Sequence, residues 1–406
     1  MIIKPADRTS DVREYYFSRK LREIAEMNSR LSGEGKPGII NLGVGAPDGM
    51  PPAEAVGTLC RSAADPGNHA YQSYVGIPEL RNAFAHWYSR YYGVELNPSC
   101  EIQPLFGSKE GILLTSLAFV NPGDRVLVPD PGYPTYTSAS KLAGAEIITY
   151  DLKEDTGWWP DFDALENADL SGVKIMWTNY PNMPTGANAS PELYQRLADF
   201  GRRHGILIVN DNPYSFILNS RPLSILAADG AKESCIELNS LSKAHNMSGW
   251  RIGMVAGDAE IISEILKVKS QMDSGMFKPM QLAAVKALEQ EPEWFARLNA
   301  GYEVRREAAG RIFGSLGLKY DSRSGGMFLW GRVSQDNPLL SGQDNADGGM
   351  SLGEMLSERL LHDAGVFITP GFIFGKNGRD YVRISLCAKP DVLEEARRRC
   401  IELIEK

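Results

Sequence analysis

The chain has 406 residues, of which 43% are hydrophobic and 23% are charged. This length is typical of two domains or of one large domain with a satellite, and the composition excludes a disordered or fibrous protein. The formal net charge of -8 argues against a nucleic-acid partner, because sequence-independent binding needs clustered Lys and Arg. The five cysteines are widely spaced without a C-x-x-C pair, so we predict reduced thiols, no metal site and no redox dithiol.

The first twenty residues, MIIKPADRTSDVREYYFSRK, lack the apolar segment of a signal peptide. No stretch of the sequence approaches eighteen uninterrupted apolar residues, the length expected of a membrane-spanning helix. We therefore expect no membrane partner and a cytoplasmic location.

An amphipathic pattern predicts a helix from Arg13 to Arg30, which ends before the Gly/Pro-rich stretch SGEGKPG. Beyond it, strand-like and helix-like segments alternate, and Pro191–His204 has a length suited to a crossover helix. The expected strands are apolar or β-branched runs: Asp124–Pro129, Ala145–Tyr150, Val173–Thr178, Ile206–Asn210, Cys235–Leu238 and Ile252–Ala256. The alternation predicts an α/β fold with a mixed, mainly parallel sheet sandwiched by helices.

The pattern changes after about Gln290. Residues 293–313 read as a long charged helix, residues 325–333 as a short strand, and residues 392–406 as a closing helix. The polar, Gly-rich segment 334–349 has no periodicity and is predicted to be a surface loop. This part of the chain is expected to form a second, α+β domain.

The most informative segment is CIELNSLSKAHNMSGWRIGMVAG, which places Lys243 in a short loop between two apolar strands. A lysine in such a loop is by default a solvated surface residue. The alternative is an amine that forms a Schiff base, with Ser240 and Arg251 holding a phosphate nearby, the arginine as a bidentate fork. The pattern S-x-S-K-x(7)-R-x-G resembles the lysine signature of the class I and II aminotransferases, the fold-type-I pyridoxal-phosphate family.

This resemblance extends over nearly the whole chain and implies a bound pyridoxal 5'-phosphate, attached to Lys243 as an imine. It implies transfer of an amino group between an L-amino acid and a 2-oxo acid by a ping-pong mechanism, with Lys243 as general base and acid. It also implies a large cofactor-binding domain over residues 52–290 and a small, discontinuous domain built from residues 1–51 and 291–406. A homodimer with shared active sites is expected.

Further residues match the family's cofactor site. In FGSKE, before an apolar helix, Ser108 and Lys109 resemble its phosphate cup, although such a helix start is by itself more often a plain cap. Tyr133 of DPGYPTY matches the aromatic residue that lies on the pyridine ring. IVNDNPY ends an apolar strand, where Asp211 matches the carboxylate that keeps the pyridine nitrogen protonated, and Tyr214 matches the tyrosine at the 3'-oxygen.

The segment YPNMPTGA is similar to the family's N-P-T-G turn but departs from it at one position. The family's asparagine directly before the proline contacts the cofactor's 3'-oxygen, and this chain has Met183 there. Asn182 is the nearest candidate for the contact, through an altered turn, and is included in the predicted cofactor site.

Three residues match positions that bind the substrate or join the subunits. Arg383 of DYVRISLC matches the arginine that binds the α-carboxylate, a role suited to a bidentate guanidinium. Gly45 of NLGVGAP lies where the family's backbone approaches the substrate, which the absence of a Cβ permits. Tyr71 resembles the tyrosine that crosses a dimer interface to the neighbour's phosphate. No motif identifies the substrate side chain, for which Arg13 and Lys278 are candidate anion partners.

Other functions fit parts of the sequence. Ser240 to Lys243 also satisfies S-x-x-K, the acylating-serine motif of penicillin-recognising enzymes, but their S-D-N and K-T-G strings do not occur. Nicotinamide binding is disfavoured, because the glycines counted from Gly43 are spaced G-x-G-x-x-x-G and no acidic ribose partner follows. A β-lyase of the same fold, acting on C–S or other bonds, and a catalytically weak cofactor-binding protein stay as alternatives.

Overall fold

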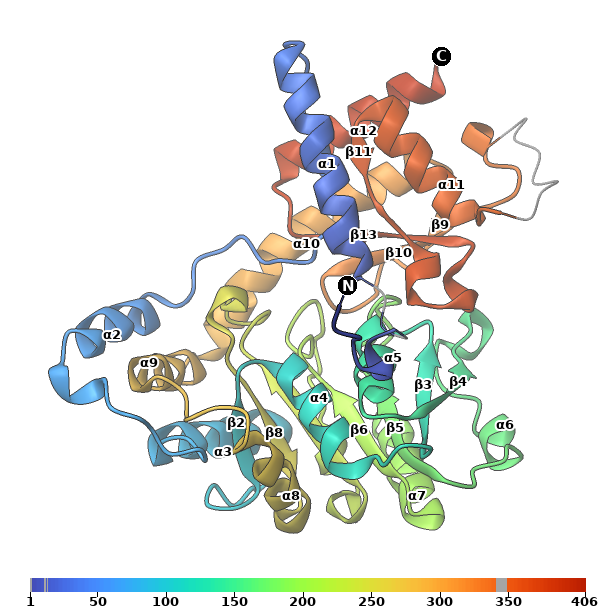
Figure 1. Cartoon of the computed structure of the whole chain (residues 1–406). Coiled ribbons are helices and arrows are strands. Elements are labelled where there is room, and N and C mark those ends of the chain that lie inside the picture. The colour runs from blue at the N-terminus through green and yellow to red at the C-terminus, as the bar shows by residue number, and fades with distance from the viewer. Residues whose placement is uncertain (1, 11, 13, 341–348) are drawn as a thin grey trace.

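A seven-stranded sheet forms the centre of the computed structural model, which describes residues 2–10, 12, 14–340 and 349–406 (Figure 1). Its order is β2-β8-β7-β6-β5-β3-β4, with β8 antiparallel to both neighbours and the remaining pairs parallel. The strands are β2 (Ile102–Leu105), β3 (Arg125–Asp130), β4 (Glu146–Asp151), β5 (Val173–Thr178), β6 (Leu207–Asp211), β7 (Cys235–Ser240) and β8 (Gly253–Gly257). The predicted mixed, mainly parallel sheet is confirmed.

One strand of this sheet was not predicted. The four residues of β2 contain Pro104, which has no N–H for a sheet ladder and so weakens the strand pattern. The position of β2 at the edge of the sheet, paired with β8 alone, explains why the proline is tolerated.

Helices cover both faces of the sheet, as the sequence predicted. One face packs against α4, α5 and α8, and the other packs against α3 and α7, so alternate residues of each strand enter two separate apolar clusters. The crossover helix α7 has the predicted bounds, Pro191–His204. The other helices of this part of the chain are α2 (Ala53–Ala63), α3 (Pro78–Tyr92), α4 (Ser108–Phe119), α5 (Pro134–Leu142), α6 (Phe162–Glu166), α8 (Ala259–Lys269) and α9 (Lys278–Leu288).

The two ends of the chain come together above the large sheet (Figure 1). There β1 (Ile40–Asn41) pairs in parallel with β11 (Val366–Phe367), next to an antiparallel sheet of order β12-β13-β10-β9. Those strands are β9 (Lys319–Tyr320), β10 (Phe328–Arg332), β12 (Thr369–Pro370) and β13 (Tyr381–Ser385). The helices are α1 (Tyr16–Gly33), α10 (Pro292–Ser315), α11 (Leu352–Arg359) and α12 (Pro390–Ile404). Arg13 and most of the predicted loop, 341–348, lie outside the described residues.

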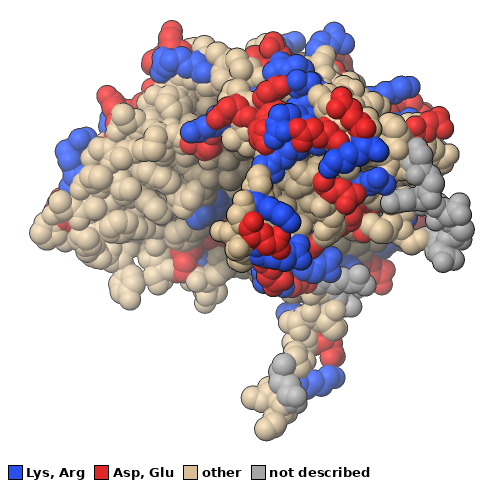
Figure 2. All heavy atoms as spheres, turned by 90° about the horizontal axis from the view of Figure 1, so that it is seen from above, with Lys and Arg blue, Asp and Glu red and all other residues tan. Residues whose placement is uncertain are grey.

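Charges of both signs are mixed on the face seen in Figure 2, where Lys and Arg lie beside Asp and Glu. Many ion pairs of the described residues lie within one helix, such as Arg398 with Glu395 and Glu402 on α12. Among the described residues, no helix is long and apolar enough to cross a membrane.

An aromatic cluster supports the loop that follows β7. The imidazole of His245 lies within 6 Å of the rings of Trp87 and Phe295, and Phe216 packs between these two rings. His245 is fully buried, and neither ring nitrogen has a hydrogen-bond partner. Burial therefore lowers the pKa of His245 to about 3, because the charged imidazolium would have no compensation in this apolar site.

Acid should destabilise the protein through His245. An unfolded histidine with a pKa near 6.5 binds a proton that the folded state excludes down to about pH 3, so stability falls as the pH drops below 6.5. Between pH 7 and pH 5 this group should lower the free energy of unfolding by about 2 kcal/mol. Urea unfolding at both pH values measures the effect, and His245→Phe should remove most of it.

The exposed His86 of α3 provides the matched control, because it is the same replacement at a side chain that is not buried in the aromatic cluster. His86→Phe should leave the difference between pH 7 and pH 5 unchanged. An equal pH dependence in wild type and His245→Phe would contradict the assignment.

Candidate active site

A cavity of about 470 Å³ opens where the carboxyl ends of the central strands meet the smaller sheet and the start of α1. Ten of the twelve predicted site residues line it: Gly45, Ser108, Lys109, Tyr133, Asp211, Tyr214, Ser240, Lys243, Arg251 and Arg383. Asn182 and Tyr71 do not, and neither does Lys278. The topology explains this convergence, because Ser108, Tyr133, Asp211 and Lys243 all follow or end strands at one edge of the sheet.

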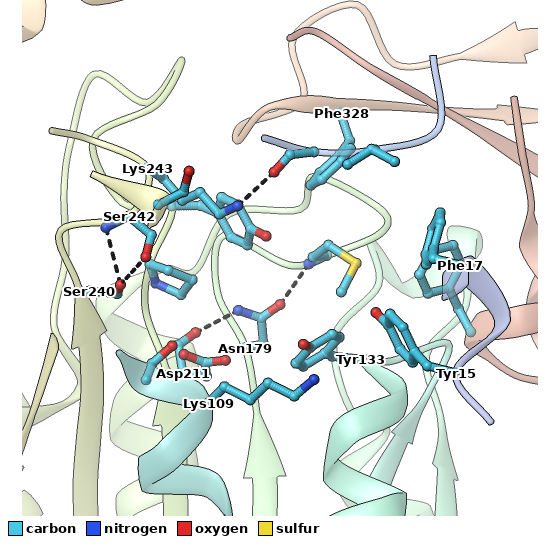
Figure 3. Close-up of a pocket in the computed structure, with 18 of the residues that line it drawn as sticks. Tyr15, Phe17, Lys109, Tyr133, Asn179, Asp211, Ser240, Ser242, Lys243 and Phe328 are labelled. Carbon is cyan, nitrogen blue, oxygen red and sulfur yellow. Dashed lines mark hydrogen bonds between the residues drawn. The ribbon is translucent and has the colours of Figure 1, made fainter. Parts of the chain in front are cut away.

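Lys243 projects into the cavity from the loop after β7 (Figure 3). Its Nζ donates a hydrogen bond of 2.7 Å to the carbonyl oxygen of Gly45, which belongs to the segment after β1. Burial, together with the positive charges of Arg383 and Arg251, lowers the pKa of Lys243 to about 8. About a tenth of this amine is therefore uncharged, and so nucleophilic, at pH 7, far more than for an ordinary lysine.

Asp211 ends β6 at the floor of the cavity (Figure 3). Its Oδ2 accepts a hydrogen bond of 3.0 Å from the Tyr136 hydroxyl, while its Oδ1 is buried without a partner. Burial raises the pKa of Asp211 to about 6, against the opposing hydrogen bond from Tyr136. A buried carboxylate oxygen without a donor is costly unless a ligand supplies one, so Oδ1 marks the place for a cationic N–H group.

Hydroxyl, guanidinium and backbone N–H groups gather beside Lys243. The Ser240 hydroxyl donates to Ser242 at 2.7 Å, and Arg251 Nη1 donates to the same Ser242 oxygen at 3.3 Å. Helix α4 begins at Ser108, so its N-terminal N–H groups face this cluster. Gly107 is required there, because a Cβ would lie 2.1 Å from Arg251 Nη2 and its φ is +83°. The arrangement suits a phosphate.

Arg383 lies across the cavity on β13 and is buried without an acidic partner among the described residues. Its guanidinium carbon is 3.9 Å from the ring centre of Phe328 and 4.7 Å from that of Phe374. Nη2 donates to the Gly43 carbonyl oxygen at 2.9 Å, and Nη1 donates to Met183 Sδ at 3.1 Å. Burial lowers the pKa of Arg383 to about 10, which still leaves it charged at neutral pH.

The prediction for Asn182 needs correction. Its Oδ1 accepts from the Thr185 hydroxyl at 2.8 Å, and its Nδ2 donates to the Asn179 carbonyl oxygen at 3.2 Å. Both ends of the amide are thus used inside the turn, and the side chain does not reach the cavity. Asn179 and Met183 line the cavity instead. The position of Asn179 directly after β5 was the signal that could have identified it.

Several lining residues were not predicted. Two of them, Ser242 and Ser248, belong to the segment around Lys243. Four others come from the start of α1: Tyr15, Phe17, Ser18 and Leu21. Figure 3 shows Tyr15 and Phe17 on the side of the cavity opposite Lys243. Tyr71 lies before α3 with 91% of its surface exposed, so the predicted contact with a neighbouring subunit stays a prediction.

Known proteins resemble the chain over its full length. The family model of aminotransferase class I and II matches residues 37–399. The LL-diaminopimelate aminotransferase of Dehalococcoides mccartyi is 38% identical over 395 residues, which is 97% of each chain. That of Aquifex aeolicus is 38% identical over 95% of this chain and 98% of its own. The structure of substrate-bound BacF from Bacillus subtilis has a TM-score of 0.89 at 34% identity and covers 99% of this chain and 98% of that one.

The fold, the cavity and these relatives agree, and the chain belongs to the class I and II aminotransferases. It is a pyridoxal-phosphate-dependent transaminase, which moves an amino group between an amino acid and a 2-oxo acid. The S-x-x-K alternative fails structurally as well, because a 3-10 turn at Ser248–Trp250 and then β8 follow Lys243, where that motif requires a long helix.

The lowered pKa of Lys243 can be measured in cofactor-free protein. Reductive methylation with formaldehyde and cyanoborohydride requires the uncharged amine, so the reaction of Lys243 should be half-maximal near pH 8. An exposed lysine, with an ordinary pKa of about 10.4, should react only at higher pH. Peptide mass spectrometry across a pH series gives both curves, and half-maximal labelling of Lys243 at pH 10 or above would contradict the assignment.

Proposed function

We propose that Lys243 is the lysine to which pyridoxal 5'-phosphate attaches covalently, and that the other predicted residues hold the cofactor around it. One observation supports this proposal most strongly. The Lys243 amine, the unpartnered Oδ1 of Asp211 and a cluster of hydrogen-bond donors suited to a phosphate all line one cavity. Ser108, Ser240, Ser242 and Arg251 would bind the phosphate, and Asp211 would pair with the protonated ring nitrogen. Tyr133 and Tyr214 would contact the ring, and Lys109 would lie near the phosphate.

The charge balance of the cavity supports this assignment. The lining residues include four cations, Lys109, Lys243, Arg251 and Arg383, and one acid, Asp211. When held there, pyridoxal phosphate would supply an electron sink for the pair left on the substrate Cα after proton removal. Lys243 Nζ is suited to take that proton, because an amine with a pKa near 8 is a competent base at neutral pH. Arg383 supplies the unpaired charge for the α-carboxylate.

The amino donor that we propose is LL-diaminopimelate or a similar amino dicarboxylate, with a 2-oxo acid as acceptor in a ping-pong cycle. The relatives with about 38% identity over nearly the whole chain carry that substrate in their names. A half-reaction screen with single amino acids, which follows the change in cofactor absorbance, identifies the donor. The absence of a response to LL-diaminopimelate alongside a response to another amino acid would reassign the side-chain preference and leave the chemistry intact.

A domain division accompanies the proposal, with a large domain over residues 52–290 and a small one from residues 1–51 and 291–406. All strands of the seven-stranded sheet fall between residues 102 and 257. The pairing of residues 40–41 with 366–367 joins the two ends in the smaller unit.

Borohydride reduction of the holoenzyme should fix the cofactor to Lys243, which peptide mapping would locate. Lys243→Ala should abolish the label and reduce transamination by several orders of magnitude, because no other group replaces both the covalent link and the base. Lys278→Ala is the matched control, since Lys278 lies outside the cavity and should keep both the label and the rate. Wild-type turnover in Lys243→Ala would refute the proposal.

A homodimer with shared sites is the proposed assembly. Exposed apolar and aromatic side chains, among them Met50, Tyr71, Tyr74, Met272 and Phe277, are available for an interface. The left part of the face in Figure 2, on the side where Figure 1 shows α2, carries few charged residues. Tyr71 would then reach the phosphate of the neighbouring site.

Subunit mixing tests this sharing. Tyr71→Ala and Lys243→Ala chains should each be nearly inactive alone, whereas a mixed dimer contains one site with both residues intact. After subunit exchange an equal mixture should regain about a quarter of the wild-type activity, the share expected of a two-fold dimer with random pairing. Complete exchange, established by mass spectrometry, without any gain in activity would rule out the shared site.

A further inference from the structure

Arg383 is buried without an acidic partner among the described residues. A guanidinium has five N–H donors, and within the described part of the chain those of Arg383 have two partners, the Met183 sulfur and the Gly43 carbonyl oxygen. Nε is buried without a partner. Phe328 and Phe374 cover the guanidinium, and Phe17 lies 5.7 Å away. The protein thus holds the charge in place without neutralising it.

The backbone of Met183 is held inside the turn, and its side chain is buried beside Arg383. Its backbone N–H donates to Asn179 Oδ1 at 2.7 Å, and the adjacent Asn182 is locked to Thr185. The side chain is buried, with 6% of its surface exposed. The turn therefore places the thioether of Met183 beside Arg383. A methionine has three flexible torsions, and without this support its side chain would sample several positions in the cavity wall.

We propose that Met183 is a positioning residue for Arg383, with its sulfur orienting the guanidinium toward the substrate carboxylate. This inference rests on the proposed function. A thioether is a weak acceptor without charge, so it can fix one Nη1–H bond while the guanidinium keeps its affinity for an anion. A carboxylate at this position would neutralise the arginine and compete with the substrate. An aliphatic side chain would leave Nη1–H without an acceptor, and the guanidinium would then be oriented only by the Gly43 carbonyl oxygen and the covering rings.

The position of the contact determines which kinetic constant depends on it. An amino acid and a 2-oxo acid present the same α-carboxylate to Arg383, and that carboxylate does not take part in proton transfer. Loss of orientation should therefore weaken the binding of both substrates alike and leave the chemical step nearly unchanged.

The test compares Met183→Leu, which keeps the size but removes the acceptor, with Met183→Gln, whose amide oxygen restores one. In the holoenzyme, Met183→Leu should raise KM for the amino acid and for the 2-oxo acid by a similar factor of about five, with kcat within twofold. Met183→Gln should return both KM values to within about twofold of wild type. Met176→Leu, the same replacement in the core of β5, is the control for a general packing effect.

A binding measurement supplements the kinetics. Pimelate carries the carboxylates of diaminopimelate without its amino groups, so it reports on carboxylate binding alone. Calorimetry with the holoenzyme should give a Kd about five times weaker for Met183→Leu than for wild type, and a recovered Kd for Met183→Gln.

The outcomes separate this inference from the proposed function. Unchanged or lower KM and Kd values in Met183→Leu would overturn the inference, and so would an equal rise in the Leu and Gln variants, which would indicate shape in place of hydrogen bonding. A wild-type protein that does not bind pimelate contradicts the proposed dicarboxylate donor, and the KM comparison of the Leu and Gln variants with the protein's own amino donor then decides the role of Met183. A wild-type holoenzyme that binds pimelate but transaminates no amino acid contradicts the proposed function, while the Kd comparison still decides the role of Met183.

Discussion

An excess of positive charge around one cavity is the constraint on which the rest of the site depends. Lys109, Lys243, Arg251 and Arg383 line the cavity against one carboxylate, that of Asp211. Burying cations without partners is unfavourable, and the lowered pKa values of Lys243 and Arg383 reflect that cost. The cost is offset when anions enter, which is the condition under which a phosphate cofactor and a carboxylate substrate bind.

The fold distributes these cations over separate elements. Lys243 and Arg251 lie on the connection between β7 and β8, while Arg383 is on β13 of the smaller sheet. Carbonyl oxygens of one segment, Gly43 and Gly45, accept hydrogen bonds from Arg383 and Lys243. Because these carbonyls are neutral and belong to the backbone, they hold both cations in place without cancelling their charge.

The sequence predicted the central architecture well, because buried parallel strands are short apolar runs that local composition reveals. It missed β2, where Pro104 breaks the strand pattern, and the two-residue strands, which carry no periodicity. Lys243, Asp211 and Arg383 were each predicted from a long motif, and all three line the one cavity. The sequence predicted that Asn182 reaches the cofactor site, but its amide bonds to Thr185 inside the turn. No sequence pattern shows in which direction such an amide points. The helix α1 was expected, but its packing over the cavity depends on contacts between distant parts of the chain.

The pairing of β1 with β11 also has a consequence for how the enzyme is made. Residues 40–41 emerge from the ribosome among the first, yet their strand partner, 366–367, comes only after nine tenths of the chain. The loop that holds Lys243 and Arg383 through Gly43 and Gly45 is therefore anchored near the end of translation. A nascent chain whose central sheet has formed already contains Lys243, but the segment of Gly45 that holds the Lys243 amine is not yet anchored. Newly synthesised protein therefore passes through a stage in which the large sheet is complete and the active site is not.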